Sequence, residues 1–199
     1  MSHNTWIHRA VRGAVRPLVA TPVTPNHLTT LRLASGLGAA GLIAFGPQDL
    51  WNWAAGLFLI SLFLDRADGE LARLGGKTTP WGHKFDLMAD GTCNAVIFFA
   101  LGLGLSSSAL GDWALFMGLI AGLSVTAILL IVLRLEAMAG ERAGELQGLA
   151  GIDPDDGMVV VPVLLWLGLA DWLLVAAAIG APVFALILLN RFWRALDSG

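Results

Sequence analysis

Long apolar runs constrain this chain more than any other feature. Several of them approach or exceed the roughly 20 residues that an α-helix needs to cross a bilayer. The 199 residues are 56% hydrophobic and only 14% charged, whereas soluble domains carry about a quarter charged residues. We therefore expect an all-α, polytopic membrane protein, folded as a single domain over residues 1–199 and built as a bundle of six transmembrane helices. The predicted spans are about 28–45, 51–72, 83–104, 112–135, 157–170 and 172–190.

The last two spans are separated only by residues 170–172, so a re-entrant hairpin is an alternative to two crossings. At the other end, residues 5–19 interleave apolar side chains with Arg9, Arg12 and Arg16. That pattern is typical of an amphipathic helix on an anionic membrane surface; the alternative is a disordered basic tail. We expect residues 1–25 to form a cytoplasmic juxtamembrane segment and not a signal peptide, because prolines follow the basic residues.

The basic residues predict the orientation of the spans. They gather at the two termini and in the connections after spans two and four, whereas residues 46–50, 105–111 and 170–171 carry no Lys or Arg. Because basic loops stay in the cytoplasm, both termini should be cytoplasmic, and Trp51, Trp53, Trp113 and Trp172 would line the opposite interface. The formal charge of −3 and the absence of a Lys/Arg-rich run argue against a nucleic-acid partner.

Four aspartates lie where spans two and three meet the cytoplasm. Asp65 and Asp68 share one helix face, and Asp86 and Asp90 share another, because residues three or four apart lie on one face. A short turn makes the two helices antiparallel neighbours, so four carboxylates can converge at membrane depth, where ionisable groups indicate function. Like charges in such a site need compensation, and hard divalent cations such as Mg²⁺, Mn²⁺ or Ca²⁺ supply it. Cys93, the single cysteine, is expected only to pack.

Small residues and a cation continue the face of span two. Gly69 and Ala72 leave room for a ligand, and Arg73 can reach a phosphate oxygen. Together with metal-bound carboxylates they indicate a diphosphate site. The alternative for Gly69 and Ala72 is that they only allow close helix packing. Glu70 points off this face and is expected to pair with Arg73 or Lys77.

These residues form one continuous motif, Asp65-x2-Asp68-Gly69-x2-Ala72-Arg73-x8-Gly82-x3-Asp86-x3-Asp90. It resembles the complete signature of the CDP-alcohol phosphatidyltransferase family, with all eight fixed positions matched. The resemblance extends to residues 25–29 before span one and, more weakly, to residues 134–137 at the end of span four.

The resemblance implies a transferase of phospholipid biosynthesis. Such an enzyme takes a CDP-linked lipid, for example CDP-diacylglycerol, and an alcohol acceptor, releases CMP and makes a phosphodiester. It implies Mg²⁺, with Mn²⁺ as an alternative, at two ions per site, and a homodimer. The active site would face the cytoplasm.

Carried over by position, the resemblance also assigns roles to residues. Asp65, Asp68 and Asp86 would be metal ligands, and Asp90 would be the catalytic base and also touch a metal ion; the alternative for Asp90 is a fourth ligand only, with bound water accepting the proton. The residues implied for the cytidine diphosphate group are Asn26, Thr29, Asp68, Gly69, Ala72, Arg73 and Thr79. Lys77 and Arg134 are candidates for acceptor binding, or else ordinary positive-inside residues.

The acceptor and the reaction class leave alternatives. Residues 151–157 are acidic, where family members that use phosphorylated acceptors resemble one another in carrying arginines. An acidic wall favours a neutral or cationic alcohol, although a solvated loop that caps span five fits equally well. The rival functions are a divalent-cation transporter and a membrane transferase acting on prenyl diphosphates. A transporter does not account for the glycine, alanine and arginine at their fixed offsets. The prenyl-diphosphate transferases resemble longer chains with two separated aspartate motifs, whereas the aspartates here are clustered.

Overall fold

The computed structural model describes residues 6–139 and 157–197. Its elements in chain order are α1 (Trp6–Val15), the 3-10 turn η1 (Arg16–Ala20), α2 (Pro25–Phe45), the 3-10 turn η2 (Gln48–Leu50), α3 (Trp51–Gly75), α4 (Pro80–Gly104), α5 (Asp112–Ala139), α7 (Val160–Trp166) and α8 (Ala170–Asp197). No strand occurs in these two ranges, so the all-α prediction is confirmed.

Four of the described helices are long and apolar enough to cross a membrane: α2, α4, α5 and α8. The 25 residues of α3 match them in length, but its second half carries the charged residues of the signature. The fifth predicted span contains only the seven residues of α7, which rise about 10 Å against a bilayer core of about 30 Å. The membrane class therefore stands, whereas the six crossings are not confirmed.

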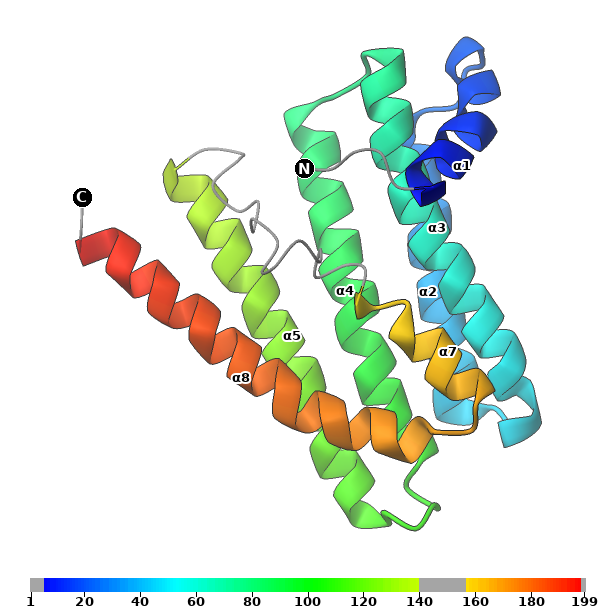
Figure 1. The fold of residues 1–199 in the computed structure, drawn as a ribbon, viewed down its shortest axis with the longest axis vertical. Coiled ribbons are helices and arrows are strands. Elements are labelled where there is room, and N and C mark those ends of the chain that lie inside the picture. The colour runs from blue at the N-terminus through cyan, green and yellow to red at the C-terminus, as the bar shows by residue number, and fades with distance from the viewer. Residues whose placement is uncertain (1–5, 140–156, 198–199) are drawn as a thin grey trace.

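The long helices lie side by side across the molecule. Helix α2 packs on both α3 and α4, α5 packs on α4, and α8 packs on α5, so that α4 lies between the α2–α3 pair and the α5–α8 pair (Figure 1). Small residues allow the close approaches. A Cβ on Gly118 of α5 would lie 2.6 Å from Gly102 Cα of α4, so no larger residue fits that crossing.

Helix α2 is also closely packed where it passes the predicted site. A Cβ on Gly36 would lie 2.5 Å from Cys93 Sγ of α4 and 3.0 Å from Ser61 Oγ of α3. Cys93 is buried, as its predicted packing role requires. The close contact fixes α2 against both helices that carry the aspartates.

The turn between α3 and α4 brings the two aspartate pairs together. Gly76 adopts a left-handed conformation with φ 59° at the end of α3, which glycine permits without strain. The Thr79 side chain caps α4 by accepting from the Gly82 N–H at 3.0 Å, and Pro80 begins the helix. The two helices are thus joined by a short turn, as the sequence predicts. They make little direct contact with each other, however, because α2 packs against both of them, so the expected pair of neighbours is bridged by α2.

Helix α1 lies against α3 (Figure 1). It contacts the C-terminal half of that helix, which is predicted to face the cytoplasm. Val11 and Val15 are buried in a small cluster with Leu28, Ala67 and Leu71. A helix is therefore present near the N-terminus, and its Val11 and Val15 side chains contact protein. A position on the membrane surface stays a prediction.

Candidate metal centre

Three of the four aspartates form a compact group. Asp65 and Asp68 of α3 and Asp86 of α4 each offer one carboxylate oxygen, and these oxygens lie within 4.8 Å of one another. Asp68 is buried at 2% exposure. Oxygens from two helices at this spacing are suited to a hard divalent cation. The site predicted from the spacing of Asp65, Asp68 and Asp86 is thus assembled by the fold.

Asp90 lies one turn further along α4 and outside this group. Its Oδ1 accepts hydrogen bonds from a terminal nitrogen of Arg32 and from Asn94 Nδ2 at 2.9 Å. Asp90 therefore lies outside the triad, and it shares Arg32 as a partner with Asp65 and Asp86.

Arg32 of α2 is a residue that the sequence analysis missed. Its side chain is only 1% exposed and pairs with the carboxylates of both α3 and α4. Nη1 lies 2.5 Å from Asp65 Oδ1 and 2.8 Å from Asp86 Oδ1, while Nη2 pairs with Asp90. One buried cation thus pairs with three of the four carboxylates. The available signal was a lone arginine inside an apolar span, which is costly unless it is paired.

Thr29 also contacts the triad. Its hydroxyl donates to Asp68 Oδ2 at 2.7 Å, and Thr29 is 1% exposed. The resemblance implies that Thr29 holds the nucleotide, whereas here its hydroxyl is engaged by a predicted metal ligand. A hydrogen bond of this kind orients a ligand and tunes its affinity for metal.

Arg73 is held beside the site by an acidic neighbour. Its Nη2 lies 3.1 Å from Glu70 Oε2, and its side chain is 54% exposed. Glu70, itself buried, also accepts from Arg12 Nε of α1 at 2.6 Å. The expected Glu70–Arg73 pair is therefore confirmed. A Cβ on Gly69 would lie 3.9 Å from Arg73 Nη2, so this guanidinium passes close to the signature glycine, and Ala72 is half-buried on the same helix.

A cavity of about 360 Å³ lies at the start of α2 and α4, lined by Thr24, Pro25, Asn26, Lys77 and Thr79. The fold thus brings together Asn26 and Thr79, two residues implied for the nucleotide. Gly82 leaves space beside them, since a Cβ there would lie 2.9 Å from Thr79 Oγ1 and 3.2 Å from Asn26 Oδ1. Thr79 Oγ1 also caps α4.

Neither of the two candidate acceptor residues bonds to the triad within the described residues. Lys77 Nζ donates to Val23 O at 3.2 Å and to Thr21 O at 3.4 Å, so it pairs with backbone and not with Glu70. Arg134 is exposed near the end of α5. Two residues further along α5, Glu136 Oε1 lies 3.1 Å from His83 Nε2 of α4. This contact joins α4 to α5. Residues 151–156 of the acidic segment lie outside the described residues.

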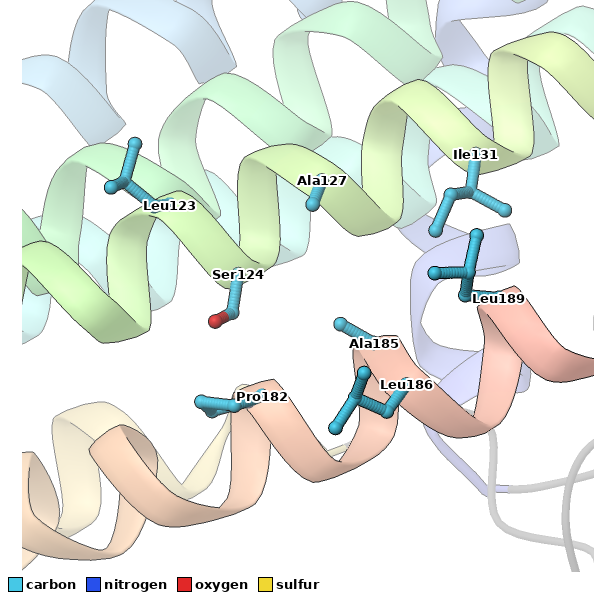
Figure 2. Close-up of a pocket in the computed structure, with 8 residues that line it drawn as sticks. All are labelled: Leu123, Ser124, Ala127, Ile131, Pro182, Ala185, Leu186 and Leu189. Carbon is cyan, nitrogen blue, oxygen red and sulfur yellow. The ribbon is translucent and has the colours of Figure 1, made fainter.

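A second cavity of about 360 Å³ is apolar and lies between α5 and α8. Figure 2 shows four side chains from each helix around it, and the only hydroxyl among them belongs to Ser124. That hydroxyl donates to Ile120 O at 2.7 Å. This cavity therefore offers no group for chemistry, and the polar site stays with α2, α3 and α4.

The chain is similar to known proteins over the region that contains this site. The family model of the CDP-alcohol phosphatidyltransferases matches residues 22–183, which include every position of the signature. A bifunctional IPC transferase and DIPP synthase from Rubrobacter xylanophilus is 34% identical over 87 residues, 44% of this chain and 19% of that protein. A phosphatidylinositol phosphate synthase from Streptomyces avermitilis is 33% identical over 86 residues, 42% of this chain and 34% of that protein.

A CDP-diacylglycerol–glycerol-3-phosphate 3-phosphatidyltransferase from Cereibacter sphaeroides is 32% identical over 90 residues, 45% of this chain and 39% of that protein. Each alignment thus spans less than half of the relative's own length. The family model, in contrast, covers most of this chain, including all of α2, α3 and α4. On this match, the chain belongs to the CDP-alcohol phosphatidyltransferase family.

Proposed function

We propose that this protein transfers a phosphatidyl or related phospholipid group from a CDP-linked lipid, such as CDP-diacylglycerol, to an alcohol acceptor and releases CMP. The observation that carries the proposal is the carboxylate triad of Asp65, Asp68 and Asp86, whose oxygens lie within 4.8 Å of one another at three signature positions of the family. We assign the reaction to phospholipid biosynthesis.

The triad would hold Mg²⁺, with Mn²⁺ as an alternative and two ions per site. Its carboxylate oxygens fit such ions, because hard cations prefer oxygen ligands. Divalent ions bound there would neutralise charge on the diphosphate of the CDP-lipid. Asp65, Asp68 and Asp86 act as ligands, and Asp90 touches the metal region from the next turn of α4.

Asp90 acts as the general base. An alcohol hydroxyl is a weak nucleophile, and a carboxylate within hydrogen-bond reach takes its proton during attack. The acceptor oxygen forms a bond to the lipid-linked phosphorus, the bond between that phosphorus and the bridging oxygen breaks, and CMP leaves with the electron pair. The product is a phosphodiester, and the proton remains on Asp90 until it is lost to water.

The CDP group would lie between the triad and the cavity at the start of α2. Arg73 is close to Gly69 and would turn from Glu70 toward a phosphate oxygen. The small side chain of Ala72 leaves room for the diphosphate on the same helix face. Asn26 and Thr79 line the cavity that would take the cytidine. Thr29 supports this site through Asp68, and Lys77 and Arg134 stay candidates for the acceptor.

The whole chain would be a single domain with six spans, cytoplasmic termini and a cytoplasmic active site, and it would act as a homodimer. Cysteine labelling of separate Ser107→Cys and Ser198→Cys variants tests the topology, with little background because Cys93 is buried. Labelling from opposite sides of the membrane is expected. Labelling of both from one side would contradict the orientation.

An acceptor screen tests the function. Purified protein receives CDP-diacylglycerol labelled in its lipid, a divalent ion and one alcohol at a time, and CMP and the lipid product are measured. The relative named for glycerol-3-phosphate supports a phosphorylated acceptor, whereas the acidic residues 151–157 support an unphosphorylated one. Release of CMP together with a phosphodiester lipid formed from any one of the tested alcohols supports the proposal. Ion flux into liposomes or turnover of a prenyl diphosphate, without CMP release, would support a rival function.

A further inference from the structure

We propose that Arg32 is a positioning residue for Asp90: it holds this carboxylate at a fixed place beside the Asp65–Asp86 pair, with one oxygen left for the acceptor hydroxyl. The inference rests on the proposed function, because it gives Asp90 the role of base. The assignment comes from the pairing of Arg32, which is not one of the signature positions.

The burial of Arg32 shows that its charge belongs to the site. The side chain is 1% exposed, and a buried cation is stable only when it is paired and hydrogen-bonded. All the ion pairs found for Arg32 in the described part of the chain go to the aspartates of the signature. Its Nε is buried without a partner among the described residues, so the two terminal nitrogens alone hold the guanidinium.

These two nitrogens have different partners. Nη1 contacts Asp65 and Asp86, two members of the triad, at 2.5 and 2.8 Å. Nη2 contacts Asp90, which lies outside the triad. Because a guanidinium is a rigid planar fork, the place of Nη2 follows from that of Nη1. Arg32 thus couples the position of Asp90 to the position of the metal ligands.

Both hydrogen bonds to Asp90 fall on the same oxygen. Oδ1 accepts from Arg32 and from Asn94 Nδ2, the latter at 2.9 Å, and Asn94 is nearly buried. Within the described ranges, Oδ2 receives no hydrogen bond. Two donors on Oδ1 fix the rotation of the carboxylate, so Oδ2 is the oxygen that takes the acceptor proton.

The backbone of Arg32 is fixed as well. Its carbonyl accepts from Ser61 Oγ of α3 at 3.0 Å and from Ser35 Oγ at 2.9 Å. One turn along α2, Gly36 allows the close contact with Ser61 and Cys93. The guanidinium therefore extends from a helix that is docked against both α3 and α4.

The test compares Arg32→Lys, Asn94→Ala and a matched control, Arg191→Lys, on the exposed end of α8. For each purified variant, Mn²⁺ binding is titrated by electron paramagnetic resonance, and kcat and the KM of both substrates are measured. Lysine keeps the charge, but its single nitrogen on a flexible stem lacks the rigid fork that holds the triad and Asp90 at a fixed separation. We expect kcat to fall about 10- to 100-fold, as for a slightly misplaced reacting group, with Mn²⁺ affinity and the KM for CDP-lipid within about threefold.

Asn94→Ala loses one of the two bonds to Oδ1 and should lower kcat about three- to tenfold, with Mn²⁺ binding unchanged. Arg191→Lys should match the wild type. If Mn²⁺ affinity falls as much as kcat in Arg32→Lys, the arginine builds the metal triad and the inference is wrong. Unchanged kcat in both site variants would also overturn it.

Two controls keep the outcomes separate. The wild-type protein is assayed first, and absence of CMP release there contradicts the proposed function and not the role of Arg32. If Arg32→Lys does not run as a folded species in detergent, Asn94→Ala decides by the same two readouts, because it retains Arg32.

Discussion

Replacing Thr29 with valine tests which partner its hydroxyl serves. In the structure Thr29 Oγ1 donates to Asp68 Oδ2 at 2.7 Å, and both residues are at most 2% exposed. Valine keeps the branched shape of threonine but cannot donate a hydrogen bond. The Asp68 oxygen would lose its donor at a place from which water is excluded, so the carboxylate would be less well oriented for a metal ion.

The size of the effect follows from this geometry. A hydrogen bond to a charged group contributes about 1.5–3 kcal/mol, and burial of both groups means that solvent screens little of it. Loss of a group that orients a metal ligand typically lowers metal affinity about 10- to 100-fold, which corresponds to about 1.4–2.8 kcal/mol. The two ranges agree, so we expect the Mn²⁺ dissociation constant of Thr29→Val to rise about 10- to 100-fold.

The assay is a Mn²⁺ titration of the purified variant, followed by the KM for CDP-lipid at saturating Mn²⁺. Thr29→Ser should restore metal affinity, because serine keeps the hydroxyl. Thr30→Val is the matched control, since the Thr30 hydroxyl is exposed and donates to the Asn26 carbonyl at 2.8 Å. An unchanged Mn²⁺ affinity with a raised KM for CDP-lipid would refute the reasoning and return Thr29 to a direct contact with the nucleotide.

Three further substitutions test the site. Asp65→Asn should abolish CMP release while the melting temperature stays within a few degrees, because Arg32 keeps its other two carboxylate partners; near-normal turnover at saturating metal would exclude Asp65 as a ligand. Asp90→Asn should stop transfer but leave the affinity for CDP-lipid within about threefold of the wild-type value. If this variant also loses CDP-lipid binding, Asp90 is chiefly a metal ligand. Arg73→Ala should lower CDP-lipid affinity about tenfold. This loss is at the low end for a charged contact, because Arg73 must leave Glu70 to reach the ligand. Normal CDP-lipid binding in a titration of this variant would place Arg73 outside the site.

Much of the candidate site could be predicted from sequence, because it depends on local periodicity. Asp65 and Asp68 are three residues apart and Asp86 and Asp90 four apart, so each pair lies on one helix face. The short turn after Gly76 then reverses the chain and places the two aspartate pairs at the same end of the bundle, where α2 packs against both helices. Neither step requires knowledge of contacts between distant segments.

Contacts from distant segments could not be predicted in the same way. The bonds of Arg32 to Asp86, and of Arg12 to Glu70, join residues 54 and 58 positions apart, and no spacing rule gives them. Arg32 nevertheless had a signal, since it is the only charged residue between positions 28 and 45. A charge inside an apolar span indicates function, so this rule singles out Arg32 as well as the aspartates.

The number of crossings was also beyond the sequence pattern. Hydropathy treats residues 157–170 as one apolar run, but α7 ends at Trp166 and Gly168 adopts φ 70° before α8 begins. A left-handed glycine ends a helix without strain. Apolar composition therefore predicts membrane contact at this point, while backbone conformation decides how the run is divided.

The most direct test of the central claim is the stoichiometry of CMP release. Purified protein in detergent is given CDP-diacylglycerol labelled in the cytidine, together with the acceptor found in the screen, with Mg²⁺ or with a chelator. The account predicts one CMP for each phosphodiester formed with Mg²⁺, none with the chelator, and none from a folded Asp86→Asn variant. CMP release that persists in the chelator or in Asp86→Asn would contradict the claim that this carboxylate triad performs metal-dependent transfer.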